Sequence, residues 1–580
     1  MLIPKIVCAV LALISVAPAG MAAQTSPARS AVLRPDIREL PADQQIIQAL
    51  NRLTFGPRPG DVQKVRVVGL DNWIDQQLHP EKLNDAAIEQ FVAKYPAINQ
   101  DQNDLLRQYA EQQRERREVR RADSTRVMSG QDSMMARQQL AQRFNLTRQV
   151  VTQLQSSRVA RAVASERQLQ EMMTDFWENH FNIYAQKGGP EPYYLTDFDQ
   201  NVIRPRALGK FRDLLEAVAQ SPAMLFYLDN ARSMADSTRP TLARRQLQQR
   251  QRQGLNENYG RELLELHTLG VDGGYTQQDV INVARAFTGW TIKPPAQGGG
   301  FIFRPGVHDA GEKIVLGHKL RAGRGMEDAQ DVLDILARNP STARFISFKL
   351  ARRFVSDSPS KALVDHAAQV YLKTNGDIRE VVRAIITSPE FFSRQAFRAK
   401  VKSPFEVVVS AMRALNASPD SSPRSAQVIA FLGQPIFGHQ APNGWPETGE
   451  AWMNTGAILN RINFGMAVAA GRLPGVDIRA LPALDTIRSA PRVRQVDVVV
   501  ATILNGIISP DTRAVLVSGE HPLLAGGAGG NEVQDMSSAM DPPIGGPRVL
   551  QQRSFANLPQ LTGLPQIVGL ALGSPEFQRH

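Results

Sequence analysis

Two helical segments carry a polar side chain in the middle of an apolar face, where it could do chemistry. On a wheel of about 100° per residue, "LNENYGRELLELHTLG" places Glu262 among leucines and a tyrosine. The segment "LQEMMTDFWENHFNI" places His180 on its apolar face, whereas Glu178 points the opposite way. A buried carboxylate is costly unless it is paired, protonated or bound to a metal. A histidine in such a place is more often a hydrogen-bonded core residue. We expect His180 and Glu262 to satisfy each other, directly or through an ion.

A third polar pair follows in the segment "GVHDAGEK", where His308 and Asp309 lie between turn glycines. Loops on a rigid scaffold often carry binding groups. The alternative is a turn in which Asp309 bonds its own backbone. Two imidazoles and one or two carboxylates form a divalent-metal set without thiolates. The hypothesis is therefore a metal site of His180, Glu262, His308 and Asp309, in which His180 and Glu262 are catalytic.

Three further side chains are candidates for binding. His267 lies about 140° around the helix from Glu262, so the two cannot chelate one ion from a straight helix. In the last helical turn, His267 can instead bind free carbonyl groups. The segment "PNGWPETGEAWMN" holds Trp445 and Trp452 among prolines, which makes a rigid aromatic surface suited to sugars or to a protein edge. The alternative is that both tryptophans cover a hydrophobic core.

The sequence predicts that the elements that position these residues are mostly helices. Helical periodicity dominates the chain, and a capping box of Thr276 and Asp279 starts the second helix of the first segment. The best strand signal runs from Phe301 to Gly317. The fold class predicted is mainly α, a large multi-helix domain with one small β-hairpin near Phe301 to Leu316. The helices expected are two within 44–78 split at Gly56–Gly60, long ones within 104–182, and others at 211–219, 255–269, 277–290, 329–354 and 378–387.

The N-terminal segment predicts export. Residues 1–23 have an early lysine, a short apolar run and a small-residue end, as in a cleavable secretory signal. We expect a periplasmic or extracellular protein without an integral membrane segment in its mature chain. The only cysteine, Cys8, lies in this segment, so the mature chain has no thiol. A mobile segment at 24–40 would precede one helical domain at 41–580, with a mobile loop at 525–546.

The charge balance argues against a nucleic-acid partner. Lys and Arg number 67 against 56 Asp and Glu, a formal net charge of +11. Much of the excess lies in two Gln/Arg-rich stretches near 110–125 and 240–254. These stretches interleave arginine with glutamine rather than with the aromatic residues that stack on bases. They fit solvated helix faces or contacts with anionic polymers better.

Several blocks of sequence resemble one bacterial family. The segment "LNENYGRELLELHTLGVDGGYTQQDVINVARAFTGW" is similar to the hallmark of the proteins known as domain of unknown function 1800. The resemblance continues through "FWENHF", "HDAGEKIVLG", "FKLARRFVSDSP", "SPFEVVVSAMRALNAS" and "GQPIFGHQAPNGWPETGEAWMNTGAILNR". It implies a mainly helical, often exported protein, often encoded beside a phosphatase- or sulfatase-like protein. It implies no established activity. The chain departs from the family by its Gln/Arg-rich insertions near Arg114 and Arg244.

Two functions from different classes fit these observations. The first is a metal-dependent hydrolase that acts on an envelope or extracellular substrate, with a divalent ion as cofactor. The second is a non-catalytic exported scaffold that docks the phosphatase- or sulfatase-like neighbour or a polysaccharide. No phosphate-binding loop or nucleophile elbow is present, which argues against ATPases and serine esterases.

Overall fold

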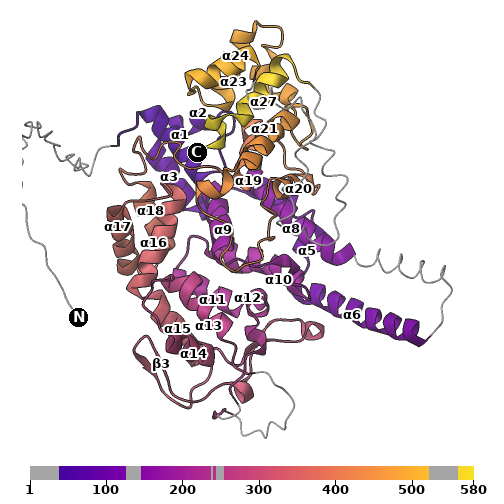
Figure 1. Ribbon diagram of the computed structural model, residues 1–580, viewed down its shortest axis with the longest axis vertical. Coiled ribbons are helices and arrows are strands. Elements are labelled where there is room, and N and C mark those ends of the chain that lie inside the picture. Colours follow the sequence, from indigo (N-terminus) through magenta and orange to yellow (C-terminus); the bar gives the residue numbers. More distant parts are fainter. Residues whose placement is uncertain (1–37, 126–144, 237–238, 243–253, 521–559) are drawn as a thin grey trace, which may run out of the picture. The chain divides into compact units, whose positions relative to one another are not determined.

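The computed structural model describes residues 38–125, 145–236, 239–242, 254–520 and 560–580. Residues Arg38–His580 form one compact unit, in which helices dominate (Figure 1). The mainly α fold class is therefore confirmed. The expected signal peptide, most of the 24–40 segment, the 525–546 loop and most of the 240–254 stretch lie outside the described residues.

The N-terminal part contains one helix more than the sequence predicts between residues 44 and 78. The break at Gly56–Gly60 is present, and a second break occurs at Gly69, whose φ of 87° interrupts the helix. The elements are α1 Ala42–Leu53, α2 Asp61–Val68, α3 Leu70–Leu78, η1 Pro80–Lys82, α4 Ala86–Val92, α5 Pro96–Asn99, α6 Gln102–Thr125, α8 Asn145–Ala164 and α9 Gln168–His180. The arginine-rich stretch at 110–125 belongs to α6.

The central part alternates α-helices with shorter helical turns, and two segments are π-helices. The elements are η2 Ala185–Lys187, α10 Glu191–Asp197, the π-helix η3 Phe198–Ile203, η4 Arg204–Arg206, α11 Phe211–Gln220, α12 Pro222–Tyr227, η5 Asn230–Arg232, α13 Glu257–Leu264, the π-helix η6 Glu265–Leu269, α14 Gln277–Ala286, α15 Glu327–Ala337, α16 Pro340–Phe354, α17 Lys361–Lys373 and α18 Ile378–Ile386. The capping box of Thr276 and Asp279 starts α14 as predicted. The helix expected over 329–354 is two helices, because Pro340 starts α16 with Asn339 as its cap.

Two short antiparallel sheets follow α14, each with two strands. The strand β2 Phe301–Phe303 pairs with the strand that precedes it in the sequence, β1 Trp290–Ile292. The strand β3 Lys313–Val315 pairs with β4 His318–Leu320. The helical turns η7 Pro295–Gln297 and η8 Pro305–Val307 lie beside β2 in the sequence. The segment expected to form one hairpin thus contributes to two sheets, because Trp290 supplies the partner strand for Phe303.

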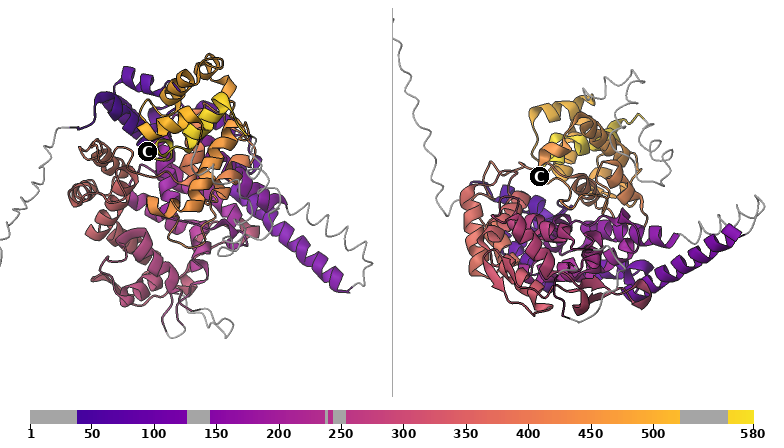
Figure 2. Two further views of the ribbon diagram at one scale, coloured as in Figure 1. Left: turned by 45° about the horizontal axis from the view of Figure 1, so that its top comes forward. Right: turned by 60° about the horizontal axis from the view of Figure 1, so that its bottom comes forward.

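The C-terminal part is a group of helices that stays together in both views of Figure 2. Its elements are α19 Pro404–Ala414, α20 Arg424–Phe431, η9 Gly449–Trp452, α21 Thr455–Ala469, η10 Ile478–Ala480, α22 Pro482–Asp485, α23 Arg492–Ile503, α24 Pro510–Ser518, α27 Gly563–Gly573 and α28 Pro575–Gln578. Helices α21 and α27 pack against each other, and α23 also packs on α27.

Two hydrophobic cores hold these helices, and helices α8 and α9 contribute to both. One face of α9 gives Met173 and Trp177 to the first core, which extends from α1 to α18. Met172 of α9 and Val159 of α8 enter the second core, which contains α19 to α28. Burial of such side chains is the main favourable contribution to folding. Helices α8 and α9 therefore form the junction at which the two cores meet.

No helix among the described residues is long and apolar enough to cross a bilayer.

Candidate functional site

A polar pocket lies where the two cores meet. Its lining residues come from α8, α9, α16, the start of α19 and the segment 434–452. The empty volume is about 940 Å3, including the solvent at the mouth of the pocket. In ligand-binding pockets, a few placed polar groups usually fix the orientation of the ligand.

The floor of the pocket is a chain of paired charges centred on two arginines. Arg353 of α16 contacts Asp175 through Nη2 and Oδ2, 3.3 Å apart, and Glu406 through Nη1 and Oε1, 3.0 Å apart. Arg158 of α8 binds the other oxygen of Asp175 at 3.2 Å and also pairs with Glu178. Asp175 is therefore held between two guanidinium groups. These pairs hold the carboxyl groups in fixed positions along the pocket.

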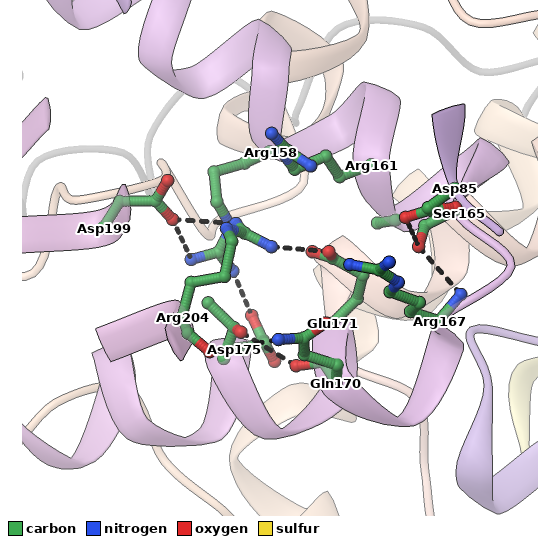
Figure 3. Close-up of polar contacts among 12 residues, drawn as sticks. Asp85, Arg158, Arg161, Ser165, Arg167, Gln170, Glu171, Asp175, Asp199 and Arg204 are labelled. Atoms are coloured by element: carbon green, nitrogen blue, oxygen red, sulfur yellow. Dashed lines mark hydrogen bonds and ion pairs between the residues drawn. The ribbon is translucent and has the colours of Figure 1, made fainter. Parts of the chain in front are cut away.

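The pairing extends from the pocket into the protein. Arg204 contacts Glu171 at 2.5 Å and Asp199 at 2.9 Å, and Asp199 also lies 3.8 Å from Arg158 (Figure 3). The close-up shows Arg158 reaching from α8 toward the carboxylates of α9. Breaking a buried pair leaves an uncompensated charge, so this network fixes the relative positions of α8 and α9.

Two lysines, Lys400 in the pocket lining and Lys349 outside it, bind the segment that carries Glu447. Lys400 pairs with Asp357 and donates from Nζ to the carbonyl of Glu447 at 3.3 Å. Lys349 contacts the Glu447 carboxylate at 2.8 Å. Four carboxylates and three cationic side chains line the pocket, so its charge is almost balanced.

The two carboxylates on Arg353 have pKa values displaced in opposite directions. Burial raises the pKa of Asp175 above its usual value, although Arg353 and Arg158 oppose the rise, and the nearby Glu406 charge adds to it. Burial alone would also raise the pKa of Glu406. The charges of Arg353 and His580 and the Ser403 amide outweigh that effect and lower the pKa of Glu406 to about 2. Opposite shifts in neighbouring carboxyl groups are typical of an acid and base pair.

Aromatic rings also line the pocket. Trp445 and Trp452 are both half-buried, with ring centroids 6.0 Å apart and planes inclined at 45°. Nε1 of Trp452 donates to the carbonyl of Pro446 at 3.1 Å, which fixes the ring against its own turn. Both predicted tryptophans therefore line a pocket, together with Phe437 and Phe405.

The C-terminal end of α9 holds the tryptophan segment in place. The Asn179 side chain donates from Nδ2 to the Trp445 carbonyl at 3.0 Å and accepts from the Trp445 amide at 2.7 Å. Asn182 donates to the carbonyls of His439 and Ala441. Gly444 has φ of 73°, and a Cβ there would lie 2.2 Å from the Asn179 carbonyl. This close approach explains the glycine before Trp445.

His180, between these residues, faces the first core as predicted. It is 2% exposed, and its Nε2 donates to the backbone carbonyl of His267 at 3.1 Å. Burial lowers the pKa of His180 well below its usual value, and the charge of Lys349 adds to the effect. The ring is neutral and caps a carbonyl of the π-helix η6. His180 therefore acts as a hydrogen-bonded core histidine here.

The π-helix η6 explains why a straight helical wheel misplaces the residues that follow α13. The wheel puts Thr268 on the solvent side, but Thr268 is fully buried and donates to the Leu263 carbonyl at 2.6 Å. The wider turn over Glu265–Leu269 shifts the register after α13. Glu262 is half-buried, and burial raises its pKa with help from the Glu265 charge. Among the described residues, Glu262 makes no hydrogen bond or ion pair.

His267 is buried in this π-helix. The sequence instead suggested that its side chain binds free carbonyl groups at the end of an ordinary α-helix. Its ring packs against Phe181, with centroids 5.1 Å apart, and burial lowers its pKa to about 3. Its backbone carbonyl is the group that receives the His180 hydrogen bond.

His308 and Asp309 lie in a loop, as predicted, but the loop is buried. Asp309 binds Arg285 through both oxygens, at 2.8 and 3.2 Å, and accepts from the Gly311 amide at 2.9 Å. His308 donates from Nδ1 to the Thr288 carbonyl at 2.8 Å. The turn in which Asp309 bonds its own backbone is therefore present.

The structure does not bring the four predicted metal ligands together. His180, Glu262, His308 and Asp309 have separate surroundings, and no three His, Cys, Asp or Glu side chains of the described part are grouped to hold a metal ion. The physical reason is that His180, His308 and Asp309 are each buried with a partner of their own, a carbonyl for each histidine and Arg285 for Asp309, whereas Glu262 is only half-buried.

The pocket residues that sequence reasoning missed are Asp175, Arg158, Arg353, Lys400 and Glu406. A helical wheel correctly places Asp175 and Glu178 outside the apolar face of α9. Helix α8 packs on this polar side of α9, so its residues are not exposed to solvent as the wheel implies. The sequence does contain a partial signal for Glu406, because "SPFE" fits a capping box, and Ser403 and Glu406 form one. Its contact with Arg353 depends on the tertiary structure.

Comparison with known proteins identifies the family and nothing closer. No curated protein and no solved structure matches the chain. One family model, described as a protein of unknown function (DUF1800), matches residues 48–579. That range includes every residue of the pocket. The chain therefore belongs to the DUF1800 family of proteins of unknown function.

Proposed function

We propose that the pocket binds a neutral, hydroxyl-rich ligand, a saccharide unit of an envelope or extracellular polymer. The observation that carries the proposal is that Trp445 and Trp452, with ring centroids 6.0 Å apart, line the same pocket as a network of paired carboxylates and arginines. A sugar ring has an apolar C–H face that packs on an aromatic ring, and hydroxyl groups at its edge. Those hydroxyls need both hydrogen-bond donors and acceptors, which paired Asp, Glu, Arg and Asn side chains supply.

The charge of the pocket supports a neutral ligand over an anionic one. Arg158 and Arg353 are already paired with Asp175, Glu178 and Glu406. An anionic ligand would have to compete with these carboxylates. A neutral ligand can bind the free lone pairs of the same groups without separating them.

Binding to soluble oligosaccharides tests the proposal. Calorimetry with oligomers of N-acetylglucosamine and of glucose should identify at least one ligand, and an anionic uronic acid oligomer should bind less tightly than that ligand. Trp445→Ala and Trp452→Ala should each weaken its binding about tenfold, equivalent to ~1.4 kcal/mol. The matched control is Trp73→Phe, because Trp73 is also half-buried but packs outside the pocket. Absence of any saccharide ligand, or tryptophan variants with unchanged affinity, would refute the proposal.

A second candidate is hydrolysis at the same pocket, and the opposite pKa shifts of Asp175 and Glu406 favour it. Asp175, the carboxyl with the raised pKa, would take the acid role and give a proton to the leaving oxygen as the C–O bond breaks. Ionised Glu406 would accept a proton from the water that attacks carbon. This form of the hydrolase hypothesis uses neither His180 nor Glu262, and it needs no grouping of metal ligands.

Product analysis separates hydrolysis from binding alone. Oligosaccharides that bind should be cleaved by the wild-type protein, and Asp175→Asn should lower kcat by at least a hundredfold while binding persists. The exposed Asp213→Asn variant serves as the control. Binding without cleavage would leave the saccharide-binding function and reject hydrolysis.

Export and the phosphatase- or sulfatase-like partner remain proposals from the sequence. Export is tested by N-terminal sequencing of the native protein, which should begin at Ala23 or Gln24. A native protein that keeps Met1 and stays in the cytoplasm would contradict it. Co-purification of the neighbouring gene product with the mature chain tests the partner.

A further inference from the structure

A second pocket, which shares no lining residue with the first, is lined by residues near the start and the end of the helical unit. It is lined by the connection after α1, the segment before α19, the end of α23 and the C-terminal residues. Its empty volume of about 440 Å3 includes solvent at the mouth. Four cationic side chains line it, and Glu576 is the only acidic side chain in that lining. The cationic residues are Arg58, Arg398, Lys402 and Arg579.

The neighbouring groups leave much of this positive charge uncompensated. Arg398 donates to the backbone carbonyls of Ile507 and Leu504, at 2.7 and 2.8 Å, which are neutral acceptors. Glu576 accepts from the Ser509 amide at 2.9 Å and from the Thr512 hydroxyl at 2.8 Å, so its oxygens already bind α24. Carbonyl and hydroxyl partners satisfy donors without neutralising a guanidinium charge.

Lys402 is the side chain with the least compensation. It is 5% exposed, and its Nζ lies 4.3 Å from the centroid of the Phe577 ring. In the part of the chain that the structure describes, the ammonium has no ion pair and no hydrogen bond. An ammonium group carries three donors, and burying them without acceptors is costly. A cation–π contact offsets only part of that cost.

We propose that this pocket is a binding site for a small oxyanion, a phosphate, sulfate or carboxylate group held by Lys402 and Arg398. The anion would supply the acceptors that the Lys402 ammonium lacks and the negative charge that the lining lacks. The small volume suits one such group rather than a polymer. The site is separate from the proposed saccharide pocket and does not depend on it.

The protonation of Lys402 gives the site a pH dependence. Burial lowers the pKa of Lys402 to about 7, although Glu406 opposes the shift, and the charges of Arg398 and Arg461 add to it. Arg58, Glu576 and Arg579 are the other charged groups that face the pocket. An anion favours the charged ammonium and raises its pKa, so binding takes up a proton near neutral pH. Affinity therefore falls as the pH rises above about 7.

Calorimetry on the full mature chain tests the site with inorganic phosphate, sulfate and acetate, and with glycerol phosphate as a lipid-headgroup mimic. At least one anion should bind, and its affinity should fall about tenfold for each pH unit above the Lys402 pKa. Lys402→Met should abolish binding and its proton uptake. The exposed Lys361→Met variant is the control.

Thermal unfolding of the same variants shows whether a loss of anion binding comes from the missing ammonium group or from a damaged fold. Without the anion, Lys402→Met should unfold at the same or a higher temperature, because it removes a buried uncompensated charge. Phosphate should raise the melting temperature of the wild type but not of the variant. If no anion binds, or if Lys402→Met binds as the wild type does, the proposal is overturned. Preference for glycerol phosphate over free phosphate would assign the oxyanion to a headgroup.

Discussion

At the scale of the residue, the "WENHFN" block distributes its side chains among three neighbours. Glu178 pairs with Arg158, Asn179 and Asn182 bind the tryptophan segment, and His180 caps a carbonyl of the π-helix. The residue types match these tasks. An amide side chain can donate and accept at once, which a carboxylate cannot do. The family motif is thus explained largely by how it positions the pocket.

The Asn179 contacts lead to a prediction. Asn179→Ala removes two hydrogen bonds to Trp445, each worth about 1 kcal/mol. We expect the free energy of unfolding to fall by about 2 kcal/mol and saccharide binding to weaken together with it. Urea denaturation and calorimetry measure the two effects. Asn201→Ala is the control, since Asn201 is exposed and its side chain bonds Asp197 rather than a pocket residue. Equal effects of the two variants would contradict the assigned role.

The buried histidines predict how stability depends on pH. Burial lowers the pKa of His267 and of His580 to about 3. Below the usual pKa of 6.5, the unfolded chain binds a proton that the folded chain does not. Their contribution to stability is therefore complete above about pH 6.5 and declines as the pH falls toward 3. At pH 4.5 the loss is about 2 to 3 kcal/mol for each histidine.

Histidine variants separate the effect of the histidines on stability from that of carboxyl groups whose pKa values are raised. Burial raises the pKa of Asp175 and of Glu191, so these carboxyls make the folded state bind protons earlier. His267→Asn and His580→Gln should each lose less stability than the wild type between pH 7 and pH 4.5. Urea denaturation at both pH values measures the difference. Parallel curves for wild type and variants would show that these histidines are charged in the folded state.

At the scale of the element, the close approach of Gly444 to α9 can be tested by comparison with Gly471, a glycine of similar backbone conformation. Gly444 and Gly471 have nearly equal φ values, 73° and 74°. Only at Gly444 would a Cβ meet another group, the Asn179 carbonyl at 2.2 Å, whereas nothing lies within 4 Å of one at Gly471. Alanine in left-handed backbone costs about 1 kcal/mol in either place.

The difference between the two alanine variants should therefore report the contact between α9 and the tryptophan segment. We expect Gly471→Ala to lower the free energy of unfolding by about 1 kcal/mol and to leave saccharide binding unchanged. Gly444→Ala should lose at least ~2 kcal/mol more, because a backbone must move, and should bind saccharide less tightly. Chemical denaturation and calorimetry give both quantities. A Gly444→Ala protein that resembles Gly471→Ala would mean that the segment can move away freely.

At the scale of the whole molecule, the two cores share helices α8 and α9. The contact of Arg353 with Glu406 joins α16 of the first core to α19 of the second, so unfolding one core would expose a charge paired with the other. We predict one cooperative unfolding transition, as the single helical domain expected from the sequence requires. Circular dichroism and tryptophan fluorescence should give coincident denaturation curves. Two separate transitions would indicate two domains.

Local patterns in the sequence determined much of this protein. The helical periodicity, the Thr276 and Asp279 capping box, and the buried position of His180 follow from interactions within a few residues. The family resemblance rests on the same local blocks. The aromatic character of the Trp445 and Trp452 segment was also readable, because prolines and tryptophans at that spacing restrict the chain.

The tertiary structure alone decided which buried polar groups meet. A wheel shows that His180 faces a core, but the carbonyl of His267 reaches it only because a π-turn widens the partner helix. A wheel likewise leaves Asp175 outside the apolar face, and only the packing of α8 and α16 against that face brings Arg158 and Arg353 to it. Hydrophobic periodicity shows which face of its own helix a residue lies on. The partner of a buried charge is fixed by helices distant in sequence, whose placement local patterns do not encode.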